Sequence, residues 1–150
     1  MSDLDRAKAL LENDSYTCVL CRGDTVYTSR LSGIAPIMQL IGSNTDLTGF
    51  SVADKLVGKA AAMLFLLAGV KEVYAGVMSQ SAMQTLRQHQ IPFSYGEAAQ
   101  TIVNRTGTGP CPMEQTVSAI SDPQQAYAAL QITVQRLKTG QRSPSKTATT

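Results

Sequence analysis

The sequence predicts a single α/β domain in which a mixed β-sheet carries helices on both faces. Residues 52–95 have the pattern of helix, strand, helix and strand in succession, an order typical of neighbouring parallel strands joined by right-handed crossovers. A hairpin rich in β-formers precedes them and is expected to join the same sheet. The 150 residues, 43% of them hydrophobic, suffice for one core but hardly for two.

The first third of the chain is predicted to hold two short helices around that hairpin. Residues 3–12 carry apolar side chains at helical spacing, and Asn13-Asp14 follow as a stop signal. Residues 16–20 and 26–28 flank Arg22-Gly23-Asp24, so this string is interpreted as a turn and not as an adhesion motif. Residues 33–41, with a proline near the start, predict a second helix, and residues 42–49 a loop.

One long helix is predicted over residues 52–68. Ser51 is a candidate N-cap with Asp54 three residues later, as in a capping box, and Gly69 suits the position that follows a last helical turn. Residues 60–67 are apolar on every face, which is typical of a helix packed between a sheet and other helices. We therefore expect this helix to lie at the centre of the domain.

The rest of the chain is predicted to alternate between strands and helices and then to form two consecutive helices. Residues 73–78 indicate a buried strand, residues 80–88 a helix and residues 93–95 a shorter strand. A glycine-rich loop over 104–110 leads to helices over 112–120 and 123–137. From residue 139 the composition turns to Gly, Ser, Pro, Thr and Lys, so we expect a domain over residues 1–138 and a disordered tail over 139–150.

Composition excludes several classes of protein. Thirteen Lys and Arg against eleven Asp and Glu leave a net charge of +2, too little to indicate a partner that is a nucleic-acid polymer or a membrane surface. No apolar run is long enough to cross a bilayer, and the N-terminus lacks the pattern of a signal peptide. Three cysteines, an odd number, do not form a disulfide framework, so we expect a cytoplasmic protein with free thiols.

Two motifs are interpreted as structural. Cys18-x-x-Cys21 has the spacing of a metal or redox pair, but residues three apart on a strand face opposite sides. The single histidine, His89, is expected in solvent at a helix end and excludes any site that needs two histidines.

Three collinear strings resemble one family. They are VADKLVGKAAA at residues 52–62, GVKEVYAGVMS at 69–79 and NRTGTGPCPME at 104–114. Together they resemble the domain of unknown function family 1893, a family of small bacterial and archaeal proteins similar in fold to cytidine deaminases, over about residues 16–137. The resemblance implies a cytidine-deaminase-like three-layer α/β/α sandwich and no established activity.

The same resemblance implies that the deaminase zinc is lost. Deaminases of this fold need His or Cys with a catalytic Glu at the start of the central helix, and Cys-x-x-Cys at the start of the next. The corresponding strings here are Val52-Ala53-Asp54-Lys55 and Ser79-Gln80-Ser81-Ala82-Met83, which contain no thiol and no imidazole. We expect no metal and no other cofactor.

Asp54, Lys55 and Lys59 are predicted to crowd the N-terminal end of the central helix, where the carboxyl edge of a parallel sheet presents its ligand site. Lys55 and Lys59 would form a like-charge pair one turn apart at the positive pole of the helix, with the helix-weakening Gly58 between them. A bound anion such as phosphate would offset these costs. In the alternative interpretation the lysines extend to solvent and Gly58 admits a neighbouring helix.

Further candidates follow the later strands. Ser79 and Ser81 open a helix and either bind an anion there or simply cap it. Asn104 and Arg105 offer polar side chains in the glycine-rich loop. Cys111 falls at the start of the next helix, where the helix dipole favours a thiolate, although a glutamate in the same turn opposes it and an inert packed thiol is the competing interpretation.

Two functional hypotheses result. The first is a zinc-less domain that binds a small phosphorylated or nucleotide-like ligand, and its candidate contacts are Lys55, Lys59, Ser79, Ser81, Asn104 and Arg105. The second is a metal-independent enzyme that transfers or hydrolyses such a ligand, with Asp54 as general base or Cys111 as nucleophile. The nucleotide part rests on likeness of fold. The oligomeric state is left open, a homo-oligomer included.

Overall fold

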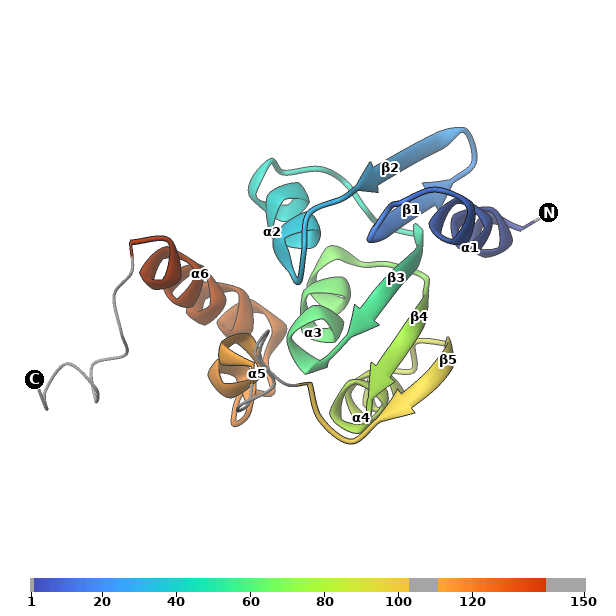
Figure 1. Cartoon of the computed structure of the whole chain (residues 1–150). Helices are drawn as coiled ribbons and strands as arrows, with labels where there is room; N and C mark the ends of the chain where they lie inside the picture. The colour runs from blue at the N-terminus through green and yellow to red at the C-terminus, as the bar shows by residue number, and fades with distance from the viewer. Residues whose placement is uncertain (1, 103–110, 140–150) are drawn as a thin grey trace, which may run out of the picture.

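The structure, a computed structural model, describes residues 2–102 and 111–139 (Figure 1). The strands are β1 (Cys18–Arg22), β2 (Thr25–Ser29), β3 (Ser51–Val57), β4 (Glu72–Ser79) and β5 (Phe93–Ala99). The helices are α1 (Asp3–Asn13), α2 (Ala35–Gly42), α3 (Lys59–Ala68), α4 (Gln80–Gln88), α5 (Pro112–Val117) and α6 (Pro123–Thr139). The predicted tail beyond Thr139 and the loop with Asn104 and Arg105 lie outside the described residues.

The described strands form one mixed sheet in the order β2-β1-β3-β4-β5. The hairpin strands β1 and β2 pair antiparallel, and β1 also pairs antiparallel with β3. From β3 to β5 the pairing is parallel, with α3 and α4 as the crossovers. The predicted mixed sheet is therefore confirmed, with β3 as an additional central strand.

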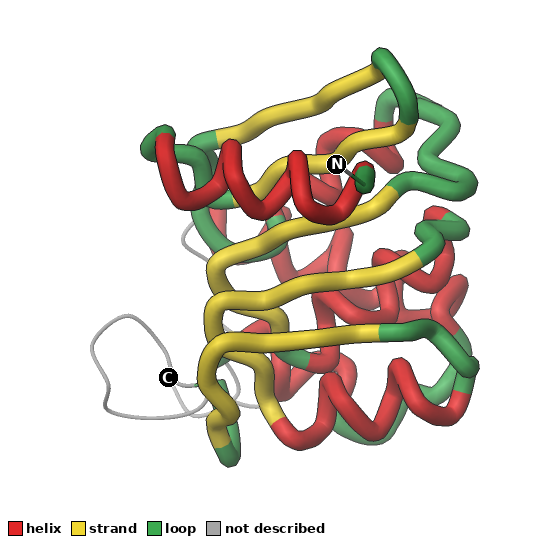
Figure 2. Tube along the Cα trace, turned by 90° about the vertical axis from the view of Figure 1, so that its right-hand side faces the viewer, coloured by secondary structure: helices red, strands yellow, loops and turns green. Residues whose placement is uncertain are grey.

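Helices lie on both faces of the sheet. Figure 2 shows α1 alone across one face, while the other helices lie behind the opposite face. The smaller core joins Ala7 and Leu11 of α1 to side chains of β1 and β3. The larger core holds most of the buried apolar side chains, including Phe50, Phe65 and Leu130, on the opposite face. This arrangement confirms the predicted α/β class with helices on both faces.

The prediction that Cys18 and Cys21 face opposite sides is confirmed. Cys18 belongs to the larger core and Cys21 to the smaller one, and both are free thiols. Their separation follows from the alternation of side chains along a strand. The pair is thus part of the packing of both faces of β1.

The predicted helix over residues 52–68 is wrong in its first half, because residues 51–57 form β3. This strand pairs with β1 on one side and β4 on the other, so it lies in the middle of the sheet. The apparent capping signals serve other purposes: the Ser51 hydroxyl donates to the Glu72 carboxylate at 2.6 Å, and Asp54 is buried beside β1. Backbone pairing with two neighbours outweighs short-range helix signals.

The central helix is α3, and it begins at Lys59. Gly58 is its N-cap with extended backbone, and Gly69 ends it in the left-handed region at φ +80°, as predicted. Six consecutive residues of α3, numbers 60–65, are buried. The helix therefore packs on all sides, which confirms the burial that its apolar composition predicts.

The other elements differ from expectation mainly in length. The helix predicted over 80–88 coincides with α4, whereas β5 extends to Ala99 and α5 ends already at Val117. His89 is exposed at the C-terminal end of α4, as predicted. Among the described residues, every helix is too short or too polar to cross a membrane.

Candidate functional site

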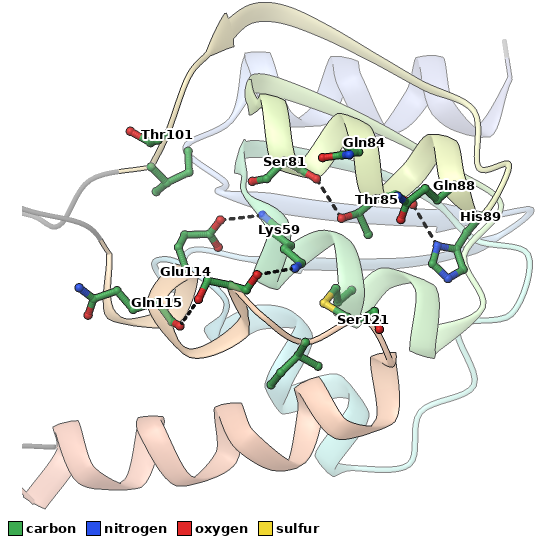
Figure 3. Close-up of a pocket in the computed structure, with 14 residues that line it drawn as sticks. Lys59, Ser81, Gln84, Thr85, Gln88, His89, Thr101, Glu114, Gln115 and Ser121 are labelled. Carbon is green, nitrogen blue, oxygen red and sulfur yellow. Dashed lines mark hydrogen bonds between the residues drawn. The ribbon is translucent and has the colours of Figure 1, made fainter. Parts of the chain in front are cut away.

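A cleft of about 780 Å³ lies between α3, α4 and α5 (Figure 3). Lys59 stands in the first turn of α3 and Ser81 in the first turn of α4, so one end of the cleft lies where β3 and β4 end. From there it follows α4 to His89 at the end of that helix. The carboxyl edge of parallel strands is the usual place for a ligand in an open α/β sheet.

Most of the residues that line this cleft carry hydroxyl or amide side chains, although apolar atoms provide the larger part of its surface. The hydroxyl and amide residues on α4 and α5 are Ser81, Gln84, Thr85, Gln88 and Gln115, and Ser118 directly follows α5. Apolar surface comes from Met63, Ile102 and Ile120, and the charged side chains are Lys59 and Glu114. Such a lining donates and accepts hydrogen bonds in several directions and can also cover the face of a ring.

Glu114 occupies the N-terminus of α3. Its two carboxylate oxygens accept hydrogen bonds from the backbone N–H groups of Lys59 at 2.7 Å and Ala60 at 2.9 Å. A Cβ atom on Gly58 would lie only 2.6 to 2.8 Å from the atoms of that carboxyl group, so residue 58 has to be glycine for Glu114 to approach. The negative charge at this helix end is therefore supplied by the chain itself.

The predicted pairing of Lys55 with Lys59 on one helix is wrong. Lys55 is an exposed residue of β3, and it borders a hollow of about 470 Å³ with the end of α1, Tyr74 and Gly76. Lys59 borders the main cleft, and its ammonium group donates to the Ser118 carbonyl at 3.2 Å, near the end of α5. Strand β3 ends at Val57 and α3 begins at Lys59, so the two lysines lie on different elements and do not converge on one anion.

Asp54 lies in β3 and not at a helix start, which corrects its predicted place in the ligand site. Only 6% of its surface is exposed, its carboxylate accepts from the Leu56 N–H at 3.3 Å, and it lies opposite Cys18 on β1. Burial raises the pKa of Asp54 to about 7, against the lowering effect of the Leu56 N–H and the Cys18 thiol. The residues that line the main cleft within the described chain do not include Asp54.

Cys18 responds to the same environment. Burial, and after it the neighbouring Asp54 carboxylate, raise the pKa of the Cys18 thiol well above its usual value. A thiol in these surroundings stays protonated and is a poor nucleophile. The buried pair therefore belongs to the interior of the sheet.

The two serines at the start of α4, Ser79 and Ser81, have different roles. Ser79 is fully buried and caps α4, its Oγ accepting from the Ala82 N–H at 3.1 Å. Ser81 borders the cleft, with its Oγ 3.2 Å from that of Ser79. Capping alone thus accounts for Ser79, and Ser81 remains the serine that a ligand can reach.

His89 lines the far end of the cleft, a position that its sequence context did not indicate. Its Nδ1 lies 3.0 Å from the Thr85 carbonyl. A carbonyl only accepts, so Nδ1 carries the proton and Nε2 is the accepting nitrogen when the ring is neutral. The ring is held at the end of α4 in one tautomer.

Cys111 is half-buried at the N-cap of α5, and its thiol makes no capping hydrogen bond. It is absent from the described lining of the cleft, as is Asp54, so the structure does not bring the two predicted catalytic residues together with Lys59 and Ser81. Glu114, Gln84 and Gln88 were not predicted. The costly glycine at residue 58 was the one signal that a group approaches there, and that group is Glu114.

Zinc ligands of the deaminase kind are not found at either helix start. Because α3 begins at Lys59, its start is formed by Gly58-Lys59-Ala60, which contains no thiol or imidazole. Helix α4 begins at Gln80, as predicted. Within residues 2–102 and 111–139, three or more His, Cys, Asp or Glu side chains do not gather as a metal site would require.

Comparison with known proteins places the chain in a family. The model of the domain of unknown function DUF1893 matches residues 6–133. The chain belongs to the DUF1893 family. A solved relative, the DUF1893 protein TM1506 from Thermotoga maritima, whose crystal structure has a resolution of 2.70 Å, is 27% identical. The match covers 87% of this chain and 89% of that one, with a TM-score of 0.79. No curated protein matches the chain.

Proposed function

We propose that this DUF1893 domain binds a small nucleoside- or nucleotide-like ligand in the cleft between α3, α4 and α5. The observation that carries the proposal is the cleft itself, because its volume of about 780 Å³ suits a small molecule and its lining is rich in hydroxyl and amide groups. The amides of Gln84 and Gln88 both donate and accept, as recognition of base edges and ribose hydroxyls requires.

The cleft has a cationic, hydrogen-bonding end and also apolar surface, and this difference orients the ligand. Lys59 and Ser81 lie at the end beside the first turns of α3 and α4, which suits a phosphate or another anionic group. Lys59 still has two N–H donors beyond the one that bonds to Ser118. Met63 and Ile120 provide apolar surface for a ring.

The sequence predicted that two lysines bind one anion, but the structure brings only Lys59 to the cleft and therefore gives less support to a strongly charged ligand. Glu114 neutralises the start of α3, and Lys55 is directed to a separate hollow. We therefore expect nucleosides and nucleoside monophosphates to bind better than inorganic phosphate alone. The enzymatic alternative through Asp54 or Cys111 receives no support from the cleft, since neither residue is in its described lining.

Calorimetric titration of the full chain with a panel of nucleosides, nucleoside monophosphates and inorganic phosphate tests this proposal. Binding is expected for members of the first two groups, and the double variant Gln84→Ala with Gln88→Ala is expected to weaken it at least about tenfold, the effect of losing one or two hydrogen bonds. Gln131→Ala, an exposed glutamine on α6 outside the cleft, is the matched control. Absence of binding across the panel, or equal binding by the double variant, would contradict the proposal.

A further inference from the structure

The free edge of β2 has none of the features that keep sheet edges from pairing. The strand reads Thr-Val-Tyr-Thr-Ser, all residues with good or neutral strand preference and without charge, proline or glycine. It is the last strand on its side of the sheet, and Thr25, Val26 and Thr28 are exposed. The opposite edge, β5, contains Gly96 and Glu97, which oppose pairing.

The hairpin decides which backbone groups of β2 point outward. Its turn has two residues, with Gly23 at φ +57°, so the flanking Arg22 and Thr25 form a hydrogen-bonded pair. Because such pairs alternate along an antiparallel ladder, Tyr27 and Ser29 also bond to β1. The N–H and C=O groups of Val26 and Thr28 therefore face the free edge.

We propose that β2 pairs antiparallel with β2 of a second copy of this chain, about a two-fold axis at Tyr27. This register places Val26 opposite Thr28 of the other copy, so that the outward backbone groups of both strands bond to each other. Beyond the two ends of β2, the same register brings Asp24 of the hairpin turn towards Arg30 of the other copy, which directly follows the strand, and this happens twice in the dimer. Charge complementarity at both ends of an uncharged strand identifies the partner as the chain itself.

Side chains on both faces suit this register. The two Tyr27 residues would form the central, closely spaced pair, and an aromatic pair at such a position stabilises a sheet. Each Tyr27 ring already stacks on Phe50 with centroids 5.5 Å apart, so its orientation is held before association. On the opposite face of β2, Val26 is 38% exposed and can contact the second copy. The guanidinium group of Arg30 lies over the Tyr16 ring, 4.4 Å from its centroid.

The dimer extends the sheet continuously from one copy to the other. It leaves the cleft between α3, α4 and α5 of each copy accessible, because that cleft lies at the other end of the strand order. Dimerisation and ligand binding are thus expected to be independent, and a failure of one proposal leaves the other standing.

Sedimentation velocity of the full chain over a range of concentrations, with charge variants, tests the pairing. Asp24→Lys alone and Arg30→Glu alone each replace two attractive pairs by two repulsive ones, so each variant is expected to dimerise about tenfold more weakly than the parent. In an equimolar mixture the new lysine meets the new glutamate and the remaining Arg30 meets Asp24, so heterodimers form with the affinity of the parent.

Val26→Pro provides a second variant of different chemistry. It removes an N–H that faces the partner and leaves the bonds to β1 in place, so dimerisation is lost while the melting temperature of the monomer is kept. A parent chain that stays monomeric at millimolar concentration overturns the proposal. Dimerisation that is unaffected by all three variants, or a mixture that behaves like its components, overturns it as well.

Discussion

Gly58 and Glu114 depend on each other, because the carboxylate lies where a side chain on residue 58 would stand. The two oxygens of Glu114 satisfy the first N–H groups of α3, which have no partner within the helix. The backbone of Gly58 is extended at φ −102°, a conformation open to any residue. Only the close approach of Glu114 therefore demands glycine here.

Gly58→Ala is expected to lower the free energy of unfolding by about 1–3 kcal/mol, because the added methyl group displaces the Glu114 carboxylate from the two backbone donors that it satisfies. Glu114→Ala is expected to cost a similar amount, because two backbone donors lose a charged acceptor. The double variant should lose little more than either single one, since the clash disappears with the carboxylate. Urea denaturation of the four proteins checks this, and additive losses would contradict it.

Asp54 is a buried carboxyl with a pKa of about 7 in the folded chain and 3.8 as its ordinary value. Between these values the folded state holds a proton that the unfolded state has released, so stability falls as the pH rises from about 4 to 7. The free energy of unfolding falls by at most about 1.4 kcal/mol per pH unit through this one group. Asp54→Asn is expected to remove this component and to leave the protein at least as stable as the parent at pH 8.

Melting temperatures of the parent and of Asp54→Asn across pH 4 to 8 provide the measurement. The difference between the two curves isolates residue 54 from all other titrating groups. Asp14→Asn, which changes an exposed residue, serves as the control and should follow the parent. Parallel curves for parent and Asp54→Asn would show that Asp54 is ionised in the folded protein throughout.

At the scale of elements, β3 demonstrates how tertiary pairing decides between helix and strand. Residues 51–57 contain apparent helix-capping signals, yet Val52, Ala53 and Val57 are fully buried in a strand with neighbours on both sides. The short-range signals are worth about 1 kcal/mol each, less than the ladders and the two buried faces that the strand gains. This element could be assigned only once its partners β1 and β4 were in place.

A second prediction at the scale of elements concerns α6 and the effect of shortening the chain at either end of it. Ending the chain after Leu137 is expected to leave the melting temperature nearly unchanged, because the segment removed holds almost nothing apolar and Leu137 is itself 51% exposed. Ending it after Asp122 removes the buried Ala126 and Leu130 and should prevent folding. Thermal denaturation of both shortened chains tests these two expectations. A large drop in the melting temperature of the chain that ends after Leu137 would mean that the tail packs on the domain.

At the scale of the whole molecule, the chain is expected to bind no zinc at the starts of α3 and α4. Gly58-Lys59-Ala60 and residues 79–83 lack the thiolate and imidazole ligands that zinc prefers. Metal analysis by mass spectrometry, on protein never exposed to an immobilised-metal resin, checks this. One equivalent of zinc that survives dialysis and is lost on Glu114→Ala, which removes the carboxylate at the start of α3, would contradict it.

Much of the architecture could be predicted from the sequence by itself. Helical periodicity, strand composition and the glycines at turns and helix ends identified most elements, and the strand-helix-strand order implied parallel pairing and a mixed sheet. These signals are local, and burial of an apolar face repeats them over many residues. The resemblance of three strings added the family, which the family comparison confirms.

Only the tertiary structure decided the candidate site. Lys55 and Lys59, four residues apart, are directed to different hollows because a strand ends and a helix begins between them. Glu114 reaches α3 from 55 residues away in the chain, a contact that no spacing rule encodes. A ligand site depends on which distant side chains meet, and that is determined by packing of the whole chain and not by the local pattern around each residue.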